Sequence, residues 1–102
     1  MSNVEKAPGK YELAVVFVPT YDEESLKPEL DNVTGLIERF GGTVEKTDNW
    51  GKRKTSYEIR DYNEGIYCFI TFTAPATTPI EIEQRIRIME PVLRYLIIKQ
   101  DK

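Results

Sequence analysis

The chain has 102 residues, a length that suits one domain. Its formal net charge is −3, so the protein as a whole does not attract nucleic acid electrostatically. It contains no histidine and a single cysteine, Cys68, which removes the commonest general base and any internal disulfide. No stretch approaches the roughly 18 apolar residues of a membrane span, and no signal-peptide core is visible. We therefore expect a flexible tail over residues 1–9, one domain over residues 10–100 and a cytoplasmic location.

The first half of the chain predicts a strand, a helix and a second strand. Residues 11–18, YELAVVFV, form a short β-rich run bounded by a proline. Residues 25–40 carry apolar side chains at helical spacing, with Ser25 as the expected N-cap and two glycines after the last turn. A start at Asp22 is the alternative, and it would enclose a proline in the helix. Residues 43–59 are predicted to be extended.

The second half predicts a hairpin, a helix and a last strand. Residues 61–65, DYNEG, form a turn cluster, and the apolar run over residues 66–73 predicts the third strand. The stretch TPIE, with Thr78 as N-cap, has the form of a capping box and predicts a second helix that ends at a proline. Residues 92–98, VLRYLII, predict the fourth strand.

The order β-α-β-β-α-β predicts an α+β, ferredoxin-like sandwich, in which both helices cover one face of a four-stranded antiparallel sheet. The uncovered face of such a sheet normally carries polar side chains. In this sequence both faces are apolar in three of the four strands, which is typical of a partner surface. The alternative is that strand twist and the N-terminal tail hide part of this apolar face from solvent. The residues on it that we assign to a protein partner are Val16, Tyr67, Phe69, Leu96 and Ile98.

A basic triplet interrupts the otherwise mildly acidic chain in the stretch NWGKRKTSYEI. Successive strand residues alternate between faces, so Lys52 and Lys54 are expected to project one way and Arg53 the other. Two lysines about 7 Å apart can meet neighbouring phosphates, although cations also protect an exposed sheet edge from aggregation. Trp50 and Tyr57 could stack on a base beside these cations or pack within the hairpin.

The third predicted strand loosely echoes the signature of RNA-recognition motifs. In EGIYCFITF a glycine precedes the spaced aromatics Tyr67 and Phe69, but no basic residue precedes Gly65. A protein-facing role therefore suits these aromatics better than base stacking.

Candidate catalytic groups are few. Asp22, Glu23 and Glu24 cluster before a predicted helix, where acidic side chains complement the helix dipole. The sequence has no glycine loop that would cradle a phosphate, no metal-ligand spacing and no nucleophile near a base. These observations predict a protein without catalytic activity, metal or cofactor.

Three stretches together resemble the ribosomal protein six family of the bacterial small ribosomal subunit. They are YELAVVFVP, WGKRKTSYEI and RIMEPVLRYLIIK, and the turn DYNEGIY also fits. The resemblance spans about residues 10–100, and departs from the family pattern at Thr55 and Glu58. It implies a ferredoxin-like fold, no catalysis, and binding to the central domain of 16S ribosomal RNA as a heterodimer with ribosomal protein eighteen, in a bacterial or plastid ribosome.

The resemblance also implies roles for particular residues. Lys52, Arg53 and Lys54 fall on the family's basic segment, and Arg94 falls on its arginine-bearing last strand. These four residues, with Trp50 beside them, are the expected RNA contacts. The aromatic positions assigned to the protein partner by resemblance are Tyr11, Tyr67 and Phe69. Two alternatives are a standalone protein resembling RNA-recognition motifs and a self-associating ferredoxin-like regulatory domain.

Overall fold

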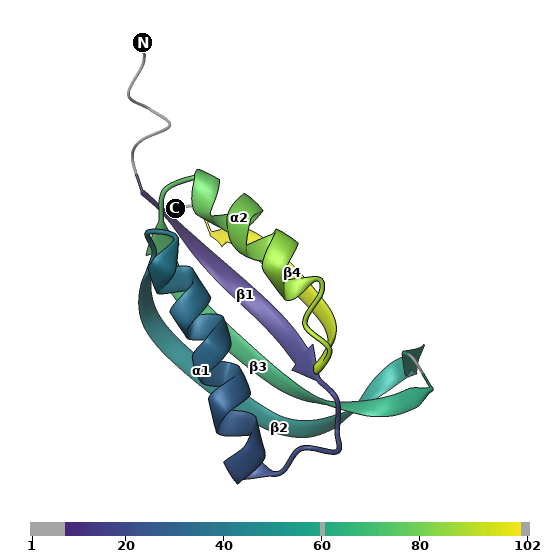
Figure 1. The fold of residues 1–102 in the computed structure, drawn as a ribbon. Coiled ribbons are helices and arrows are strands. Elements are labelled where there is room, and N and C mark those ends of the chain that lie inside the picture. The colour runs from purple at the N-terminus through teal and green to yellow at the C-terminus, as the bar shows by residue number, and fades with distance from the viewer. Residues whose placement is uncertain (1–7, 60, 101–102) are drawn as a thin grey trace.

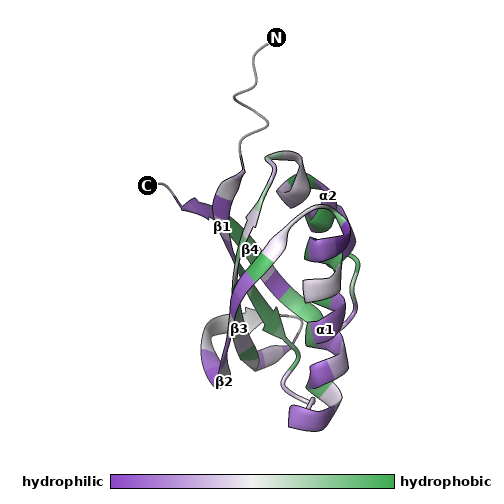
Figure 2. Cartoon of the chain, turned by 90° about the vertical axis from the view of Figure 1, so that its left-hand side faces the viewer, coloured by the Kyte–Doolittle hydropathy of each residue, from purple (hydrophilic) through white to green (hydrophobic). Residues whose placement is uncertain are grey.

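The computed structural model describes residues 8–59 and 61–100 and shows two helices packed on one face of a four-stranded sheet (Figures 1 and 2). The strand order is β2-β3-β1-β4, and all neighbouring strands are antiparallel. The predicted ferredoxin-like sandwich is therefore confirmed. The expected tail lies mostly outside the described residues, although Gly9 already belongs to the first strand. The elements are β1 (Gly9–Phe17), α1 (Glu23–Arg39), β2 (Thr43–Ile59), β3 (Tyr62–Ala74), α2 (Thr77–Ile86) and β4 (Val92–Gln100).

The core lies between the sheet and the helices. Alternate residues of β1 and β3 point toward the helices and are almost fully buried, because residues two apart share a face of a strand. Phe17 and Phe72 are the largest fully buried side chains. Truncation of such an aromatic residue to alanine costs about 3–5 kcal/mol of stability. The helical residues that complete this core are Leu26, Val33, Ile37, Ile82 and Ile86.

Helix α1 begins three residues earlier than the Ser25 N-cap predicts. Asp22 is the N-cap: its carboxylate accepts a hydrogen bond from the Ser25 backbone N–H at 2.8 Å. In return, the Ser25 hydroxyl accepts one from the Asp22 backbone N–H at 3.0 Å. This reciprocal box satisfies two otherwise unpaired donors, so the alternative start at Asp22 is the correct one and Pro28 lies inside the helix.

The predicted capping box at Thr78 is wrong. Thr78 lies inside α2, is fully buried, and donates its hydroxyl hydrogen bond to the backbone carbonyl of Phe40 at 2.6 Å. Phe40 is the C-cap of α1, where helix carbonyls lack partners within the helix. Thr78 therefore links the end of one helix to the start of the other instead of capping its own.

The hairpin between β2 and β3 is tighter than the predicted turn over residues 61–65. β3 already begins at Tyr62, and Tyr62 pairs with Ile59. Asp61 adopts a positive φ of 69° in the connection. Because β1 pairs with β3 only as far as Ile66, the hairpin continues past β1 and projects beyond the sheet (Figure 1).

Candidate binding face

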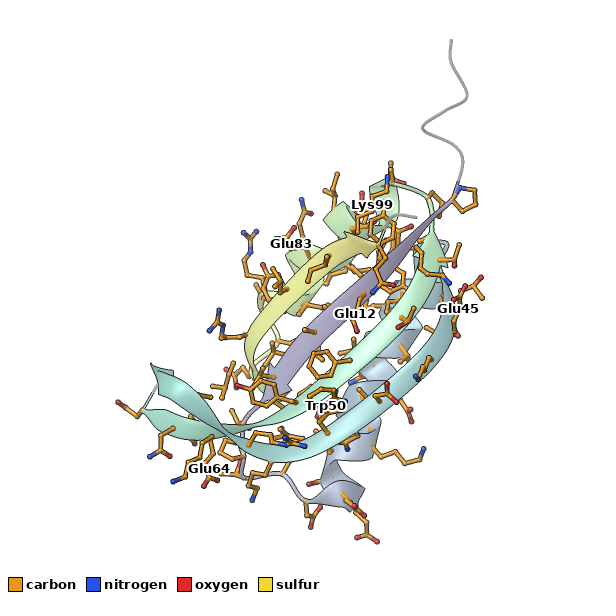
Figure 3. The ribbon with its side chains drawn as sticks, turned by 180° about the vertical axis from the view of Figure 1, so that it is seen from behind. Glu12, Glu45, Trp50, Glu64, Glu83 and Lys99 are labelled. Carbon is orange, nitrogen blue, oxygen red and sulfur yellow. The ribbon has the colours of Figure 1, made fainter. Side chains whose placement is uncertain are left out.

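The sheet surface opposite the helices, here called the open face, is seen directly in Figure 3. Strand register gathers apolar side chains at its centre. Val16 lies beside Tyr67 on β3, and Ala14 lies between Phe69 on β3 and Leu96 on β4. Leu96 is 57% exposed and Ile98 is 47% exposed, although both are large aliphatic side chains. We call this set the apolar patch; it consists of Ala14, Val16, Tyr67, Phe69, Leu96 and Ile98.

A glycine allows the patch to pack closely at one end. A Cβ atom added at Gly65 would lie only 2.3 Å from the Val16 side chain and 3.3 Å from the Phe17 carbonyl. Because glycine lacks that atom, the Val16 side chain packs directly over the Gly65 backbone and is 6% exposed. The remaining hollow over the patch holds only about 160 Å³, so this surface suits a broad partner better than a small molecule.

A β-bulge places Trp50 on the open face. Asn49 pairs with Cys68 and Gly51 pairs with Tyr67, which leaves Trp50 as the extra residue of β2. Gly51 has a positive φ of 80°, and its N–H donates a hydrogen bond to the Asn49 side chain at 2.8 Å. The Trp50 ring centroid lies 4.7 Å from that of Phe69, with the rings tilted by 57°. Trp50 is nevertheless 54% exposed, so the bulge presents an aromatic surface to solvent.

The bulge also decides on which face each member of the basic triplet lies. Arg53 pairs with Gly65, a residue of the open face, and its guanidinium carbon lies over the Trp50 ring at 5.4 Å. Lys52 pairs with Ile66 on the helix-covered face, and Lys54 pairs with Glu64, which points to the same side in the projecting hairpin. The predicted alternation is thus confirmed, and the triplet does not form one surface.

Lys52 has acidic neighbours on its own side of the sheet. It lines a hollow of about 430 Å³ together with Asp22 and Glu23, at the start of α1. Hydrogen bonds from the Ser25 backbone N–H and then from its hydroxyl hold the pKa of Asp22 below the ordinary value of 3.8. Asp22 is therefore ionised at neutral pH, so the hollow that Lys52 lines also carries negative charge, which opposes the approach of a phosphate there.

Charged side chains of β1 and β2 on the open face form ion pairs with one another. Lys10 forms an ion pair with Glu45 at 3.5 Å, and Glu45 also accepts a hydrogen bond from the Thr73 hydroxyl. Lys46 pairs with Asp48 at 3.6 Å. The Lys10–Glu45 pair lies toward the start of β1, whereas Asp48 lies opposite Phe69 of the apolar patch, and Arg53 and Arg94 border the patch beside Gly65 and Val16.

Tyr11 lies apart from the other residues assigned to a protein partner. Its side chain is on the helix-covered face, is 7% exposed, and stacks on Phe72 with ring centroids 5.6 Å apart. It belongs to the core and does not join the open face, because residues two apart in a strand share a face and Tyr11 therefore points the same way as Leu13 and Val15. The side chain of Tyr57 falls outside the described residues.

Sequence reasoning missed several residues that shape this surface. Ala14 belongs to the patch by the same alternation that identified Val16, so the signal was present. Gly51 and Gly65 position Trp50 and Val16, and their signals were the dipeptides Trp-Gly and Glu-Gly inside predicted extended or turn segments.

The described residues offer little else that is chemically reactive. Cys68 is buried on the helix side, and burial raises the pKa of its thiol to about 11, so the thiol is protonated near neutral pH. Within residues 8–59 and 61–100, no three potential metal ligands gather into a cluster. Over the same ranges, the helices are too short or too polar to cross a membrane.

This fold and this face define a class: a ferredoxin-like protein whose uncovered sheet surface carries apolar and aromatic side chains bordered by arginines, as is typical of a surface that meets a partner. Comparison with known proteins narrows the class. The family model described as ribosomal protein S6 matches residues 10–99. The chain belongs to this ribosomal protein S6 family, as the resemblance predicted, and is a structural, non-enzymatic protein of the small ribosomal subunit.

Individual relatives are similar to this chain over nearly its whole length. The small ribosomal subunit protein bS6 of Clostridium kluyveri is 45% identical over 94 residues, covering 92% of this chain and 99% of that protein. The protein of the same name from Clostridium botulinum (strain Hall) is 42% identical over 92 residues, covering 90% and 98% of the two chains. The crystal structure of 30S ribosomal protein S6 from Thermotoga maritima superposes with a TM-score of 0.86 at 28% identity, over 91% of this chain and 88% of that chain.

Proposed function

We propose that the chain binds the central domain of 16S ribosomal RNA as a heterodimer with ribosomal protein eighteen of the small subunit, on the ribosome in the bacterial cytoplasm. The observation that carries this proposal is the uncovered apolar patch with Arg53 and Arg94 at its border. The patch suits a protein and the arginines suit RNA, so one face can serve a composite assembly.

The aliphatic part of the patch supports a protein partner. Leu96 and Ile98 lie on the edge strand β4 and are about half exposed. Burial of a large aliphatic side chain contributes about 1.5–3 kcal/mol, whereas a phosphate or sugar surface offers it no equivalent gain. These side chains therefore favour a partner that has an apolar surface of its own.

The charge of the chain supports joint rather than independent RNA binding. The net charge is −3, and Lys52 lines the same hollow as Asp22 and Glu23. Each phosphate contact contributes through counterion release, so a few cations on an acidic protein give weak affinity that salt lowers further. A partner that adds positive charge beside Arg53 and Arg94 would extend the electrostatic surface and raise the association rate.

A substitution on β4 tests the proposed protein contact. Leu96→Asp should lower the affinity for ribosomal protein eighteen by about tenfold or more, because it places a charge in an apolar interface. Ile88→Asp is the matched control, since Ile88 is 76% exposed and lies outside the patch. Equal affinities for the two variants in calorimetry would contradict the proposed contact surface.

The two alternatives predict other outcomes. An RNA-recognition motif would stack bases on Tyr67 and Phe69, but Phe69 is already packed by the Trp50 ring. A self-associating domain would form a homodimer through the open face without any other component. A sizing column run on the purified chain separates this alternative from the heterodimer, for which the isolated chain is expected to be monomeric.

A further inference from the structure

We propose that Trp50 and Arg53 together form a stacking site for one unpaired nucleobase, with the Nη groups of Arg53 donating to a neighbouring phosphate. The inference deepens the proposed function, because it assumes that the open face meets RNA. It goes further by assigning the β2 side of this face to a base rather than to a phosphate alone or to the protein partner.

The Trp50 ring is held in place while much of its surface stays free. The β-bulge at Gly51 turns it onto the open face, and Phe69 supports it from the neighbouring strand at 4.7 Å between ring centroids. A supported aromatic ring loses little conformational entropy when a ligand stacks on it, so its 54% exposed surface is prepared for a planar partner.

Arg53 is positioned by two contacts with the same residue. Its Nε donates a hydrogen bond to the Trp50 backbone carbonyl at 3.2 Å, and its guanidinium carbon lies over the Trp50 ring at 5.4 Å. One of its five N–H donors is used in this way, which leaves the Nη groups for an acceptor. No ion pair among the described residues includes Arg53, whereas Lys10 and Lys46 on this face are both paired with carboxylates.

The position of this pair on the sheet favours RNA over protein. Trp50 and Arg53 lie on β2, at one edge of the sheet, whereas Leu96 and Ile98 lie on β4, at the opposite edge. Three strand spacings, about 14 Å, separate the two edges. The aliphatic edge has the chemistry of a protein contact. Where Trp50 and Arg53 lie, the β2 edge combines an aromatic ring with a guanidinium plane, the chemistry with which proteins stack unpaired bases; the carboxylate of Asp48, opposite Phe69, is held in an ion pair with Lys46.

The chain offers its own spectroscopic probe, because Trp50 is its single tryptophan. The probe experiment titrates a central-domain fragment of 16S ribosomal RNA into the heterodimer and records tryptophan fluorescence and RNA affinity in the same samples. The Trp50→Phe heterodimer provides the blank for any tryptophan of the partner. A base stacked on the indole should quench the Trp50 emission in step with RNA binding.

Each outcome has a distinct meaning. If RNA binds and the Trp50 emission is unchanged, the stacking site is wrong and the proposed function stands. If the partner protein alone shifts the Trp50 emission and protects it from quenching, and RNA causes no further change, Trp50 is a protein contact and the stacking site is again wrong. If RNA does not bind the heterodimer at all, both proposals fail.

Substitutions separate stacking from charge. Arg53→Lys keeps the charge and loses the planar group, so RNA affinity should fall while its salt dependence stays the same. Trp50→Leu should lower RNA affinity by about 5- to 150-fold, the range expected for one stacked base, and Trp50→Phe should lower it less. Circular dichroism and the affinity for ribosomal protein eighteen verify that each variant is folded. Wild-type RNA affinity in both Arg53→Lys and Trp50→Leu would overturn the proposal.

Discussion

Lys52 and Arg53 are neighbours in the chain, yet they lie on opposite faces of the sheet, and the bulge at Trp50 decides which face each one takes. Lys52 pairs with the buried Ile66 and lines a hollow together with the acidic start of α1. Arg53 pairs with Gly65 and lies over the Trp50 ring. The basic triplet therefore contributes one arginine to the open face, and its two lysines face the other way.

This division predicts unequal effects of two adjacent substitutions on RNA binding. Arg53→Ala should weaken binding of the heterodimer to the central-domain RNA and lower the salt slope by about one phosphate contact. Lys52→Ala should have a smaller effect on both quantities, because Lys52 faces the helix side and lines a hollow that also carries Asp22 and Glu23. Filter-binding measurements across a salt series give both values. The opposite ranking would mean that RNA approaches from the helix side.

Gly51 should be the backbone position on which the bulge depends. At a φ of +80° an L side chain is strained, so Gly51→Ala should lower the free energy of unfolding by about 1–2 kcal/mol. Gly35→Ala is the control: Gly35 lies in α1 with nothing within 4 Å of an added Cβ, and alanine there should stabilise by about 0.4–1 kcal/mol. Urea unfolding measures both changes. A neutral Gly51→Ala would show that β2 tolerates another conformation at this point.

Thr78 should contribute to stability through its hydroxyl and not through its size. Thr78→Val keeps the shape of the side chain but leaves the Phe40 carbonyl without this donor, which should cost about 1–3 kcal/mol. Thr78→Ser keeps the donor and should cost less. Thermal unfolding compares the two variants, and a valine variant as stable as the serine variant would indicate that another donor, such as water, reaches the carbonyl.

The cap of α1 should make stability depend on pH in the acid range. The folded-state pKa of Asp22 lies below its ordinary value of 3.8, because Ser25 donates to the carboxylate. The stabilisation is therefore fully present above about pH 3.8 and is lost as the pH falls through the folded pKa. Asp22→Asn keeps an N-cap without the titration and should flatten the stability profile there. An unchanged slope in urea titrations between pH 5 and pH 2 would assign the acid sensitivity to other carboxylates.

Periodicity in the sequence was sufficient to predict the fold. The alternation in β1 and the helical stripe of α1 determine which side chains are buried, and burial of those side chains drives the sandwich. Element boundaries were less predictable, because they depend on particular hydrogen bonds. Asp22 and Ser25 form a reciprocal cap, and the hydroxyl of Thr78 bonds to a residue far away in the chain.

The residues of the open face were predicted in outline and missed in detail for a physical reason. Strand alternation identifies Val16, Leu96 and Ile98 wherever pairing is regular. Alternation does not reveal where a bulge inserts an extra residue, so the bulge that brings Trp50 onto Phe69 was not predicted. Resemblance assigned Tyr11 to a partner surface, whereas its parity on β1 places it in the core.

We propose that this chain and ribosomal protein eighteen bind RNA as one composite surface. The most direct test measures the affinity of the purified chain for a central-domain fragment of 16S ribosomal RNA, with and without ribosomal protein eighteen, at one fixed salt concentration. The predicted result is weak binding by the chain alone and tight binding once the partner is added. Equal affinity in the two measurements would contradict the claim.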